Sequence, residues 1–245
     1  MLMDRMKRAC MALYRLAFPG ETDAFTEALF DRYYPTCIRT VCENGEPISM
    51  LFSIPYPMLT EEGEVESHYL YGVATHPDHR GKGLAKQLLA AEAARYPVFL
   101  RPMTPSLFAF YEKAGFTPIS PIQSWEEEAT PGDEHCRHIS ATEYLDARVY
   151  HALLPLCTPT ETFLSLYEQG GGGFVECGEE AAALYDLQGD TVIFKEFWGS
   201  VHLAPRMAGF VGGKRLSLRR YHPNGEPFGV GIGIPAEAAF LAALD

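Results

Sequence analysis

The cysteines of this sequence lack the close pairing that a zinc site or a redox motif needs. The 245 residues include six cysteines, none in a Cys-x-x-Cys pair: Cys10, Cys37, Cys42, Cys136, Cys157 and Cys177. His135, Cys136 and His138 lie together, but in one short stretch and without the two-pair spacing of a structural zinc site. We therefore expect reduced thiols, as in a cytoplasmic protein, and no metal.

Long apolar runs are also missing. The amino-terminal stretch is interrupted by Arg15 and has no small-residue cleavage site, so it does not read as a secretory signal. No segment approaches the length of about 20 apolar residues that a membrane-spanning helix needs. The sequence predicts a cytoplasmic protein without a membrane partner, in which an apolar fraction of 47% supplies the core.

Basic residues are scarce relative to acidic ones. Lysine and arginine number 20 against 32 aspartates and glutamates, which gives a net charge of −12. A surface of this sign repels a nucleic-acid backbone and attracts cationic small molecules. We therefore expect no nucleic-acid partner, and a small-molecule amine, preferably cationic, as the ligand; the sequence leaves a homodimer open.

Two familiar phosphate-loop patterns, Gly-x-x-x-x-Gly-Lys-Ser/Thr and Gly-x-Gly-x-x-Gly, are absent as well. In their place residues 69–89 read as a strand, a turn with two glycines and an amphipathic helix without interruption. Gly81 and Gly83 let the backbone approach a ligand, and the first amides of the helix have no partner within it. Arg80 and Lys82 add positive charge, so the turn predicts a phosphate or pyrophosphate site.

This arrangement, Arg80-x-x-Gly83-x-Ala85 after a His76-Pro77 strand end, resembles the acyl-coenzyme A signature of the GCN5-related N-acetyltransferases, the GNAT superfamily. Residues 108–116, FAFYEKAGF, resemble a second motif of that family, the helix that ends in Tyr-Glu-Lys-x-Gly-Phe. The resemblance covers roughly residues 1–128. It implies an α/β (α+β) GNAT fold, with a mixed central sheet flanked by helices, and acetyl-CoA as co-substrate.

The resemblance also implies roles for individual residues. Tyr111 would lie beside the sulfur as general acid, because a phenol is protonated at neutral pH. Coenzyme contacts would come from the end of the central strand, the glycine turn and the next helix: Val73, Ala74, Thr75, Arg80, Gly81, Lys82, Gly83, Leu84, Ala85 and Thr104. Thr104 stands where many members have asparagine.

The base that accepts the amine proton is less determined by the sequence. Glu66 and Tyr69 are our candidates, on or just before the central strand, and His68, Tyr71 or a chain of water molecules remain alternatives. The strand period of two places Tyr69 and Tyr71 on one face and His68 on the other.

The first half opens with two predicted helices, residues 7–18 and 22–33, the second capped by Thr22 or Asp23. Residues 37–54 predict a hairpin that turns at Asn44-Gly45, and the glutamate-rich residues 61–66 predict a second, solvated hairpin.

The second half, residues 129–245, repeats the opening order of two helices and a hairpin. Capping-box patterns at Ser140 and Thr158 predict two helices, and residues 184–198 predict two strands that turn at 188–190. Residues 215–234 predict a hairpin that turns at Asn224-Gly225. We expect a second α+β domain, either an unrelated cap or a partial, degenerate GNAT half. Arg206-x-x-Gly209 superficially matches the phosphate turn, but no amphipathic helix follows it, so we expect no second coenzyme site.

A tandem chain of this kind resembles the Eis-like branch of the superfamily. The sequence therefore predicts a cytoplasmic acyltransferase that moves an acetyl group from acetyl-CoA to a primary amine by direct attack. One alternative is a non-catalytic acyl-CoA-binding sensor or regulatory protein, and another is an interaction protein that uses the scaffold for assembly. The acceptor amine is not specified by the sequence.

Overall fold

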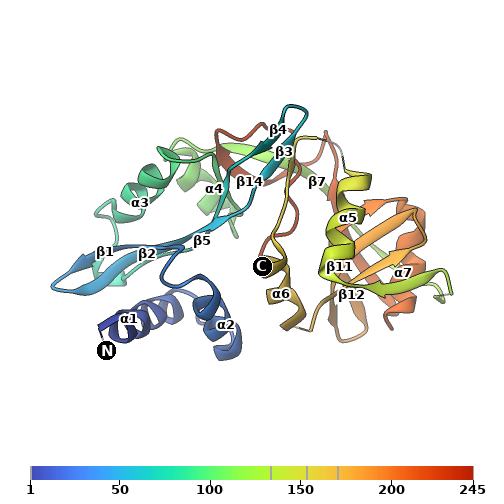
Figure 1. Ribbon diagram of the computed structural model, residues 1–245, viewed down its shortest axis with the longest axis horizontal. Helices are drawn as coiled ribbons and strands as arrows, with labels where there is room; N and C mark the ends of the chain where they lie inside the picture. The colour runs from blue at the N-terminus through green and yellow to red at the C-terminus, as the bar shows by residue number, and fades with distance from the viewer. Residues whose placement is uncertain (1, 133, 153, 170, 245) are drawn as a thin grey trace. The chain divides into compact units, whose positions relative to one another are not determined.

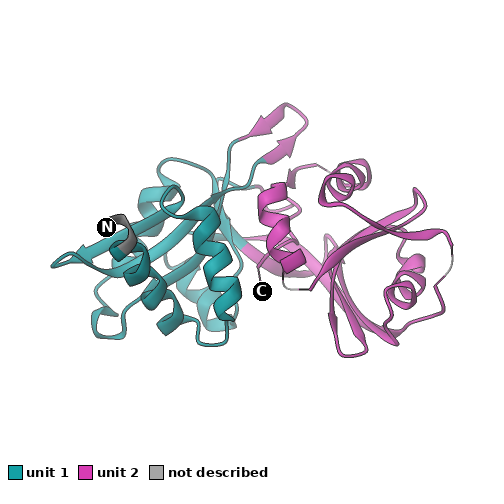
Figure 2. Ribbon diagram, turned by 60° about the horizontal axis from the view of Figure 1, so that its bottom comes forward, with its two compact units in different colours: residues 1–57, 66–117, 230–234 teal, residues 58–65, 118–229, 235–245 magenta. Residues whose placement is uncertain are grey.

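The computed structural model describes residues 2–132, 134–152, 154–169 and 171–244. The chain forms two compact units, each made of several segments (Figure 2). Unit 1 contains residues 1–57, 66–117 and 230–234, and unit 2 contains residues 58–65, 118–229 and 235–245. Both units are discontinuous in sequence, and the predicted domain boundary between residues 128 and 129 stays a prediction.

Unit 1 begins with two helices, α1 (Leu2–Ala17) and α2 (Asp23–Tyr33) (Figure 1). The first starts earlier than the predicted Lys7. The second starts as predicted, because the Thr22 hydroxyl oxygen accepts a hydrogen bond from the Phe25 backbone N–H at 3.1 Å. The buried face of α1 includes Cys10, Leu13 and Tyr14.

Five strands make the sheet of unit 1, in the order β1-β2-β5-β6-β14. They are β1 (Ile38–Glu43), β2 (Glu46–Pro55), β5 (His68–Thr75), β6 (Val98–Leu100) and β14 (Glu226–Ile232). The pairs β1/β2, β2/β5 and β14/β6 are antiparallel, whereas β5/β6 is parallel. Asn44 and Gly45, with φ of 52° and 81°, close the predicted β1/β2 turn, so that local prediction is confirmed.

The parallel strands β5 and β6 are separated along the chain by a 3₁₀ turn, η1 (Pro77–His79), and the helix α3 (Leu84–Ala93). After β6 comes the predicted second helix, α4 (Pro105–Glu112). The ladder between β5 and β6 extends only from His68↔Val98 to Tyr69↔Phe99. β5 continues to Thr75 without this partner, which leaves its carboxyl end open at the start of the glycine turn.

The strand β14 is the main departure from the sequence prediction. Residues 215–234 were expected to form a hairpin, but β13 (Arg215–Tyr221) pairs with β7 (Thr117–Glu128) and β12 (Thr191–Gly199). Val230–Ile232 of β14 instead pair with β6 and complete the sheet of unit 1. Gly225 does lie in a turn, and a Cβ there would meet the Ile122 carbonyl oxygen at 2.1 Å, so close approach to β7 explains this glycine.

Unit 2 has its own six-stranded sheet segment, in the order β7-β13-β12-β11-β10-β8. The remaining members are β8 (Cys136–Ile139), β10 (Gly173–Cys177) and β11 (Ala181–Gln188). The turn between β11 and β12 is the predicted one, at residues 188–190. A small three-stranded sheet combines β3 (Met58–Thr60), β4 (Gly63–Val65) and β9 (Leu156–Cys157), so the predicted glutamate-rich hairpin is present.

The helices of unit 2 are α5 (Ala141–His151), α6 (Glu161–Gln169), the turn η2 (Val201–Leu203) and α7 (Ala204–Phe210). Ser140 and Glu143 form the predicted capping box of α5. The cap of α6 is Thr160 rather than the predicted Thr158, since the Thr160 hydroxyl accepts from the Phe163 N–H at 3.2 Å. Arg206 and Gly209 lie inside α7, so their likeness to a phosphate turn was only superficial.

The two units repeat one pattern. In unit 2 the pairs β10/β11 and β11/β12 are antiparallel, β12/β13 is parallel and β13/β7 is antiparallel, the same succession as in unit 1. The cap sequences agree as well, because Thr-acidic-x-Phe occurs at residues 22–25 and again at 160–163. Each unit is completed by a strand from the other half of the sequence: β14 in unit 1 and β7 in unit 2.

Candidate active site

The glycine turn of unit 1 presents free backbone donors. Gly81 and Gly83 adopt φ of 76° and 78°, a left-handed conformation that side chains disfavour. Gly83 is the N-cap of α3 and provides no side-chain hydrogen bond to the first turn of the helix. A Cβ at Gly83 would meet no atom within 4 Å. The first amides of α3 are therefore available to an anion that approaches over Gly83.

Cationic side chains surround this helix start. Arg80 is exposed, and its Nε donates to the Thr75 carbonyl oxygen at 3.3 Å, which holds the residue against the end of β5. The Lys82 Nζ lies 3.3 Å from His79 Nδ1. The Lys86 Nζ donates to the Lys113 carbonyl oxygen at 3.3 Å and so connects α3 to the end of α4. Positive charge thus coincides with the positive end of the helix dipole.

A cavity of about 540 Å³ lies beside the turn, within unit 1. Most of the predicted coenzyme residues line it: Val73, Thr75, Arg80, Gly81, Gly83, Leu84 and Ala85. Lys86, Leu107 and Phe110 add an aliphatic and aromatic wall from α3 and α4. Ala74, Lys82 and Thr104 do not line it. Thr104 instead caps α4, because its hydroxyl oxygen accepts from the Leu107 N–H at 3.3 Å.

Tyr111 also lines this cavity, from the last turn of α4. Its side chain is 6% exposed, and its ring packs edge to face against Phe110 and Phe116. The hydroxyl has no hydrogen-bond partner among the residues that the structure describes. Burial raises the pKa of Tyr111 to about 12, so the phenol keeps its proton at any physiological pH. This is the protonation state that a general acid needs.

The end of β5 that faces the cavity is irregular. The β2/β5 register shifts between Met50 and Phe52, where Gly72 and Val73 together oppose a single residue. Gly72 has a φ of 61°, and a Cβ there would meet the Tyr14 ring at 3.0 Å. A bulge of this kind takes backbone groups near Val73 out of the ladder.

The two candidate bases lie away from this cavity. The Glu66 side chain is 72% exposed, with one carboxylate oxygen 3.6 Å from His68 Nε2. Tyr69 is 1% exposed and packs in an aromatic cluster with Tyr56 and Phe99. Burial lowers the pKa of His68, which therefore stays neutral near pH 7. The base role of Glu66 and Tyr69 stays a prediction.

A second polar group, which the sequence did not indicate, lies where α1 meets β5. The Tyr14 and Tyr71 hydroxyls share a hydrogen bond of 3.0 Å, and the Glu21 carboxylate lies near enough to both phenols to affect their pKa values. Burial raises the pKa of Glu21 and of both phenols. Tyr71 precedes the bulge at Gly72, two positions from the cavity-lining Val73. Glu21 lies in a loop between helices, and nothing in its sequence context distinguishes it from surface acids.

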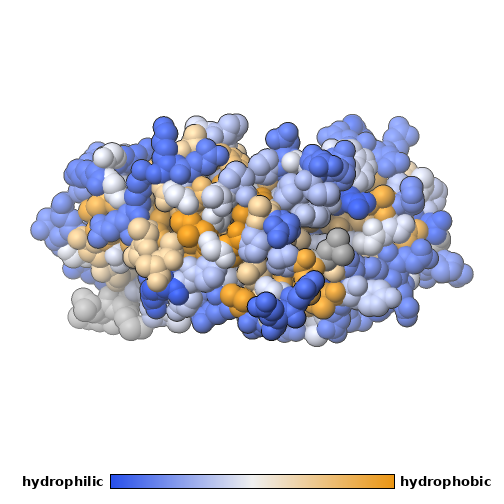
Figure 3. Space-filling model, turned by 90° about the horizontal axis from the view of Figure 1, so that it is seen from above, coloured by the Kyte–Doolittle hydropathy of each residue, from blue (hydrophilic) through white to orange (hydrophobic). Residues whose placement is uncertain are grey.

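Within the described residues, no group of three or more histidine, cysteine, aspartate or glutamate side chains could hold a metal ion. The same part of the chain contains no helix with the length and apolarity to cross a membrane. On the face drawn in Figure 3, hydrophilic residues predominate, with smaller apolar areas between them.

Comparison with known proteins agrees with this geometry. Residues 3–119 match the family model of the acetyltransferase (GNAT) domain. Acetyltransferases of this family use acetyl-CoA. The match includes both motifs, the Arg80 to Ala85 turn and the helix that carries Tyr111.

Solved structures resemble both units together. A probable N-acyltransferase from Enterococcus faecalis has a TM-score of 0.71 at 14% identity over 93% of this chain and 69% of its own. Eis1 from Mycobacterium abscessus has a TM-score of 0.64 at 12% identity, over 92% of this chain and 64% of its own. A tandem GNAT protein from the clavulanic acid biosynthesis pathway has a TM-score of 0.53 at 10% identity, over 94% of both chains.

At these identities the likeness concerns the fold. It confirms the predicted two-part fold, in which the second unit repeats the strand pattern of the first. The chain spans about two thirds of the Enterococcus and Mycobacterium proteins. The free helix start, the buried phenol and the family-model match coincide in one part of the sequence: residues 3–119 are similar to the GNAT acetyltransferase domain.

Proposed function

We propose that unit 1 transfers an acetyl group from acetyl-CoA to a primary amine. The observation that carries this proposal is the shared cavity: the uncapped start of α3, suited to a pyrophosphate, and the protonated Tyr111 phenol line the same space. The amine nitrogen attacks the thioester carbon and the carbon–sulfur bond breaks. The Tyr111 hydroxyl gives its proton to the departing thiolate, and bulk water reprotonates the phenol.

The base is proposed on different residues from those that the sequence favoured. Glu21, which lies near Tyr71, is a carboxylate with a raised pKa at the α1/α2 loop, near the bulged strand. In its ionised form it accepts the proton that the ammonium loses. Glu66 lies beside the neutral His68, and Tyr69 is enclosed by aromatic rings, whereas Glu21 lies beside the strand that carries Val73 of the cavity lining.

A cationic amine is the proposed acceptor class. The net charge of −12 favours encounter with cations, and Glu21 supplies a local negative charge. The test is thiol release from acetyl-CoA across a panel of amines that includes matched neutral and anionic analogues. Transfer to cationic amines is expected to exceed transfer to anionic ones. A preference for anionic acceptors would contradict the charge argument.

Thermal melting, combined with the thiol-release assay, distinguishes an enzyme from a sensor. Acetyl-CoA and coenzyme A should both raise the melting temperature, whereas ATP should not. Stabilisation by acetyl-CoA without thiol release from any amine would favour a sensor that binds the coenzyme without turnover. Stabilisation by ATP alone would contradict the assignment of the glycine turn as a coenzyme-binding site.

Glu21→Gln tests the base. The variant should keep acetyl-CoA affinity and lose turnover most strongly near neutral pH, where few amine molecules are free of their proton. At alkaline pH the loss should shrink, because the substrate then arrives deprotonated. Glu66→Gln is the matched comparison, and an unchanged pH profile for Glu21→Gln together with a changed one for Glu66→Gln would restore the base that the sequence favoured.

A further inference from the structure

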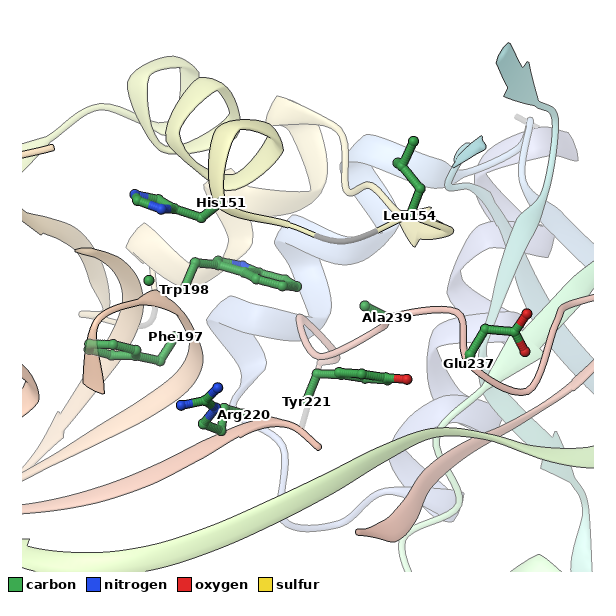
Figure 4. A pocket seen from close by; sticks show the side chains of 9 residues that line it. His151, Leu154, Phe197, Trp198, Arg220, Tyr221, Glu237 and Ala239 are labelled. Carbon is green, nitrogen blue, oxygen red and sulfur yellow. The ribbon is translucent and has the colours of Figure 1, made fainter. Parts of the chain in front are cut away.

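Unit 2 contains a cavity at the place where its two parallel strands separate. β12 and β13 pair from Thr191↔Arg215 to Phe194↔Leu218 and then continue without this pairing, to Gly199 and Tyr221 respectively. A cavity of about 300 Å³ lies at these strand ends (Figure 4). The position in the repeat matches that of the unit 1 cavity, which adjoins the open end of β5.

Two opposite charges face this cavity without partners. Arg220 has no hydrogen bond or ion pair to any residue that the structure describes, and the same holds for Glu237. Figure 4 shows them toward opposite ends of the cavity, Arg220 from β13 and Glu237 from the segment that follows β14. A ligand with one anionic and one cationic group would satisfy both.

Aromatic rings form the walls between the two charges. Figure 4 shows Tyr221 between Arg220 and Glu237, with Trp198 above Arg220 and Phe197 on the side of Arg220 away from Tyr221. Trp198 is 7% exposed, and its indole N–H is a buried donor without a partner in the described chain. Burial, and secondly the nearby Glu237 carboxylate, raises the pKa of Tyr221, which places that carboxylate close to the phenol. An apolar or aromatic body suits these walls.

The histidine at this cavity adds no charge near neutral pH. His151, at the end of α5, has a pKa lowered by burial, so it is neutral near pH 7. Arg220 is then the cation of the lining and Glu237 the anion. The cavity lies at the small end of the range for ligand sites, roughly 300–1,000 Å³.

A coenzyme does not suit this cavity. The helix that follows β12 is the seven-residue α7, with a proline at its start and no glycine turn before it. A pyrophosphate would find one arginine and no row of free amides, and Glu237 would repel it.

We propose that the unit 2 cavity binds a small zwitterionic amino acid with an apolar or aromatic side chain. Arg220 holds its carboxylate, Glu237 holds its ammonium group, and Trp198 and Tyr221 enclose its side chain. The second unit is then a binding module in which the repeat-equivalent cavity recognises an amino acid. This inference concerns unit 2 alone and is independent of turnover by unit 1.

The experiment uses the protein's own fluorescence. The chain has two tryptophans, and Trp125 is outside the cavity, so Trp125→Phe leaves Trp198 as the reporter. Phenylalanine is titrated first, then phenethylamine, which lacks the carboxylate, and hydrocinnamate, which lacks the ammonium group. Phenylalanine should change the Trp198 emission, and each analogue should bind about tenfold more weakly, having lost one charged contact.

Two variants test which charged residue contacts the carboxylate of the ligand and which contacts its ammonium group. Arg220→Gln should weaken phenylalanine and hydrocinnamate by about tenfold and leave phenethylamine unchanged, because only the first two carry a carboxylate. Glu237→Gln should weaken phenylalanine and phenethylamine and leave hydrocinnamate unchanged. The matched controls are Arg215→Gln, on the same strand but paired with Glu126, and Glu226→Gln on the exposed start of β14. Both controls should bind all three compounds as the parent does.

Several results would overturn the proposal. These are no change in Trp198 emission with aromatic or aliphatic amino acids up to about 10 mM, equal affinity for all three compounds, or quenching by acetyl-CoA in their place. Thiol release by the same preparations is measured in parallel. Acyl transfer without amino-acid binding contradicts this inference and leaves the proposed function intact. Amino-acid binding without acyl transfer contradicts the proposed function alone.

Discussion

The two units share one succession of strand pairings but differ where the parallel pair is joined. In unit 1, β5 leads through Gly81 and Gly83 into the ten-residue α3, whose first amides are uncapped. In unit 2, β12 leads through η2 into the seven-residue α7, which has proline near its start. Unit 1 therefore offers a row of free donors to an anion, and unit 2 does not.

The two units also differ after the parallel pair, where unit 1 carries Tyr111, the proposed general acid, and in the residue that lies beside the bulge. Unit 1 places α4 and Tyr111 after β6, whereas in unit 2 residues 222–225 connect β13 directly to β14. Both units shift register on the first strand of the parallel pair, near Val73 in β5 and near Lys195 in β12. Beside the second bulge lies Glu196, a fully buried carboxylate. The same scaffold thus has a cavity beside a free helix start in unit 1 and a buried ion pair beside the bulge in unit 2.

The largest expected effect concerns that buried ion pair. Arg148 Nε donates to Glu196 Oε2 at 2.7 Å, Arg148 Nη2 donates to Glu196 Oε1 at 3.0 Å, and Tyr144 donates to the same carboxylate. Arg148→Met should lower the free energy of unfolding by about 3–5 kcal/mol, because it leaves Glu196 buried without its countercharge. Urea unfolding followed by circular dichroism measures the loss.

The double variant Arg148→Met, Glu196→Leu is the control, since it removes both charges and should recover much of the stability. In unit 1 the related pair Arg39–Glu92 is 25% exposed on the arginine side, so Arg39→Met should cost less. An equal loss for Arg148→Met and Arg39→Met would show that the difference in burial does not matter.

Tyr111→Phe comes next in size. The change keeps the ring packing against Phe110 and Phe116 and removes only the proton donor, so turnover should fall by about 10²-fold with acetyl-CoA affinity near normal. Single-turnover acetyl transfer, followed across pH, measures it. Tyr150→Phe, a 76% exposed tyrosine of unit 2, should behave as the parent. Matching rates for the Tyr111 and Tyr150 variants would make Tyr111 a packing residue.

What the sequence predicted well was local. The Asn44-Gly45 turn, the Thr22 cap and the glycine turn before α3 depend on neighbouring residues, whose conformational preferences are written in the sequence. The exchange of β7 and β14 is not local, because Val230 pairs with Leu100, far along the chain. Asn224-Gly225 gave a true turn signal, but no local pattern showed that β13 would pair with β7.

The candidate site shows the same limit. Its coenzyme side follows from a contiguous motif, so most predicted residues line one cavity. Glu21 was missed because its proximity to Tyr71 arises only when α1 and α2 pack on the sheet. The predicted bases Glu66 and Tyr69 were chosen by closeness along the strand, which does not determine closeness to a cavity.

A pair of glycine variants tests the open helix start with a smaller expected effect. Gly83 and Gly45 have similar φ, 78° and 81°, and neither would place a Cβ within 4 Å of another atom. Gly83→Ala and Gly45→Ala should therefore each lower stability by about 1 kcal/mol through backbone strain. Only Gly83→Ala should weaken acetyl-CoA binding, by about tenfold, because its methyl group occupies the path of the ligand to the α3 amides.

Calorimetric titration with acetyl-CoA and with coenzyme A measures both variants. Equal affinities of the Gly83→Ala and Gly45→Ala variants for acetyl-CoA would show that strain, and not obstruction, accounts for any change at Gly83. Loss of affinity in Gly45→Ala would mean that the hairpin turn of β1 and β2 has a role in coenzyme binding that its position does not suggest.

The smallest expected effect is a difference in pH dependence between the helix caps of α5 in unit 2 and α2 in unit 1. In α5 the Glu143 carboxylate accepts from the Ser140 backbone N–H at 2.8 Å and from Arg137 at 2.9 Å, and these bonds lower the pKa of Glu143 to about 2 from 4.5. A lowered pKa in the folded state means stabilisation that is present above about pH 4.5 and lost as the pH falls toward 2. Glu143→Gln should thus lower the melting temperature slightly at neutral pH, and its difference from the parent should shrink through this window.

In α2 the residue at the corresponding position is Phe25, so the loss caused by Thr22→Ala should not change with pH over the same range. Melting curves of both variants from about pH 7 down to about pH 3 decide the matter, since a Glu143→Gln difference that persists at low pH would show that its carboxylate charge does not stabilise the helix.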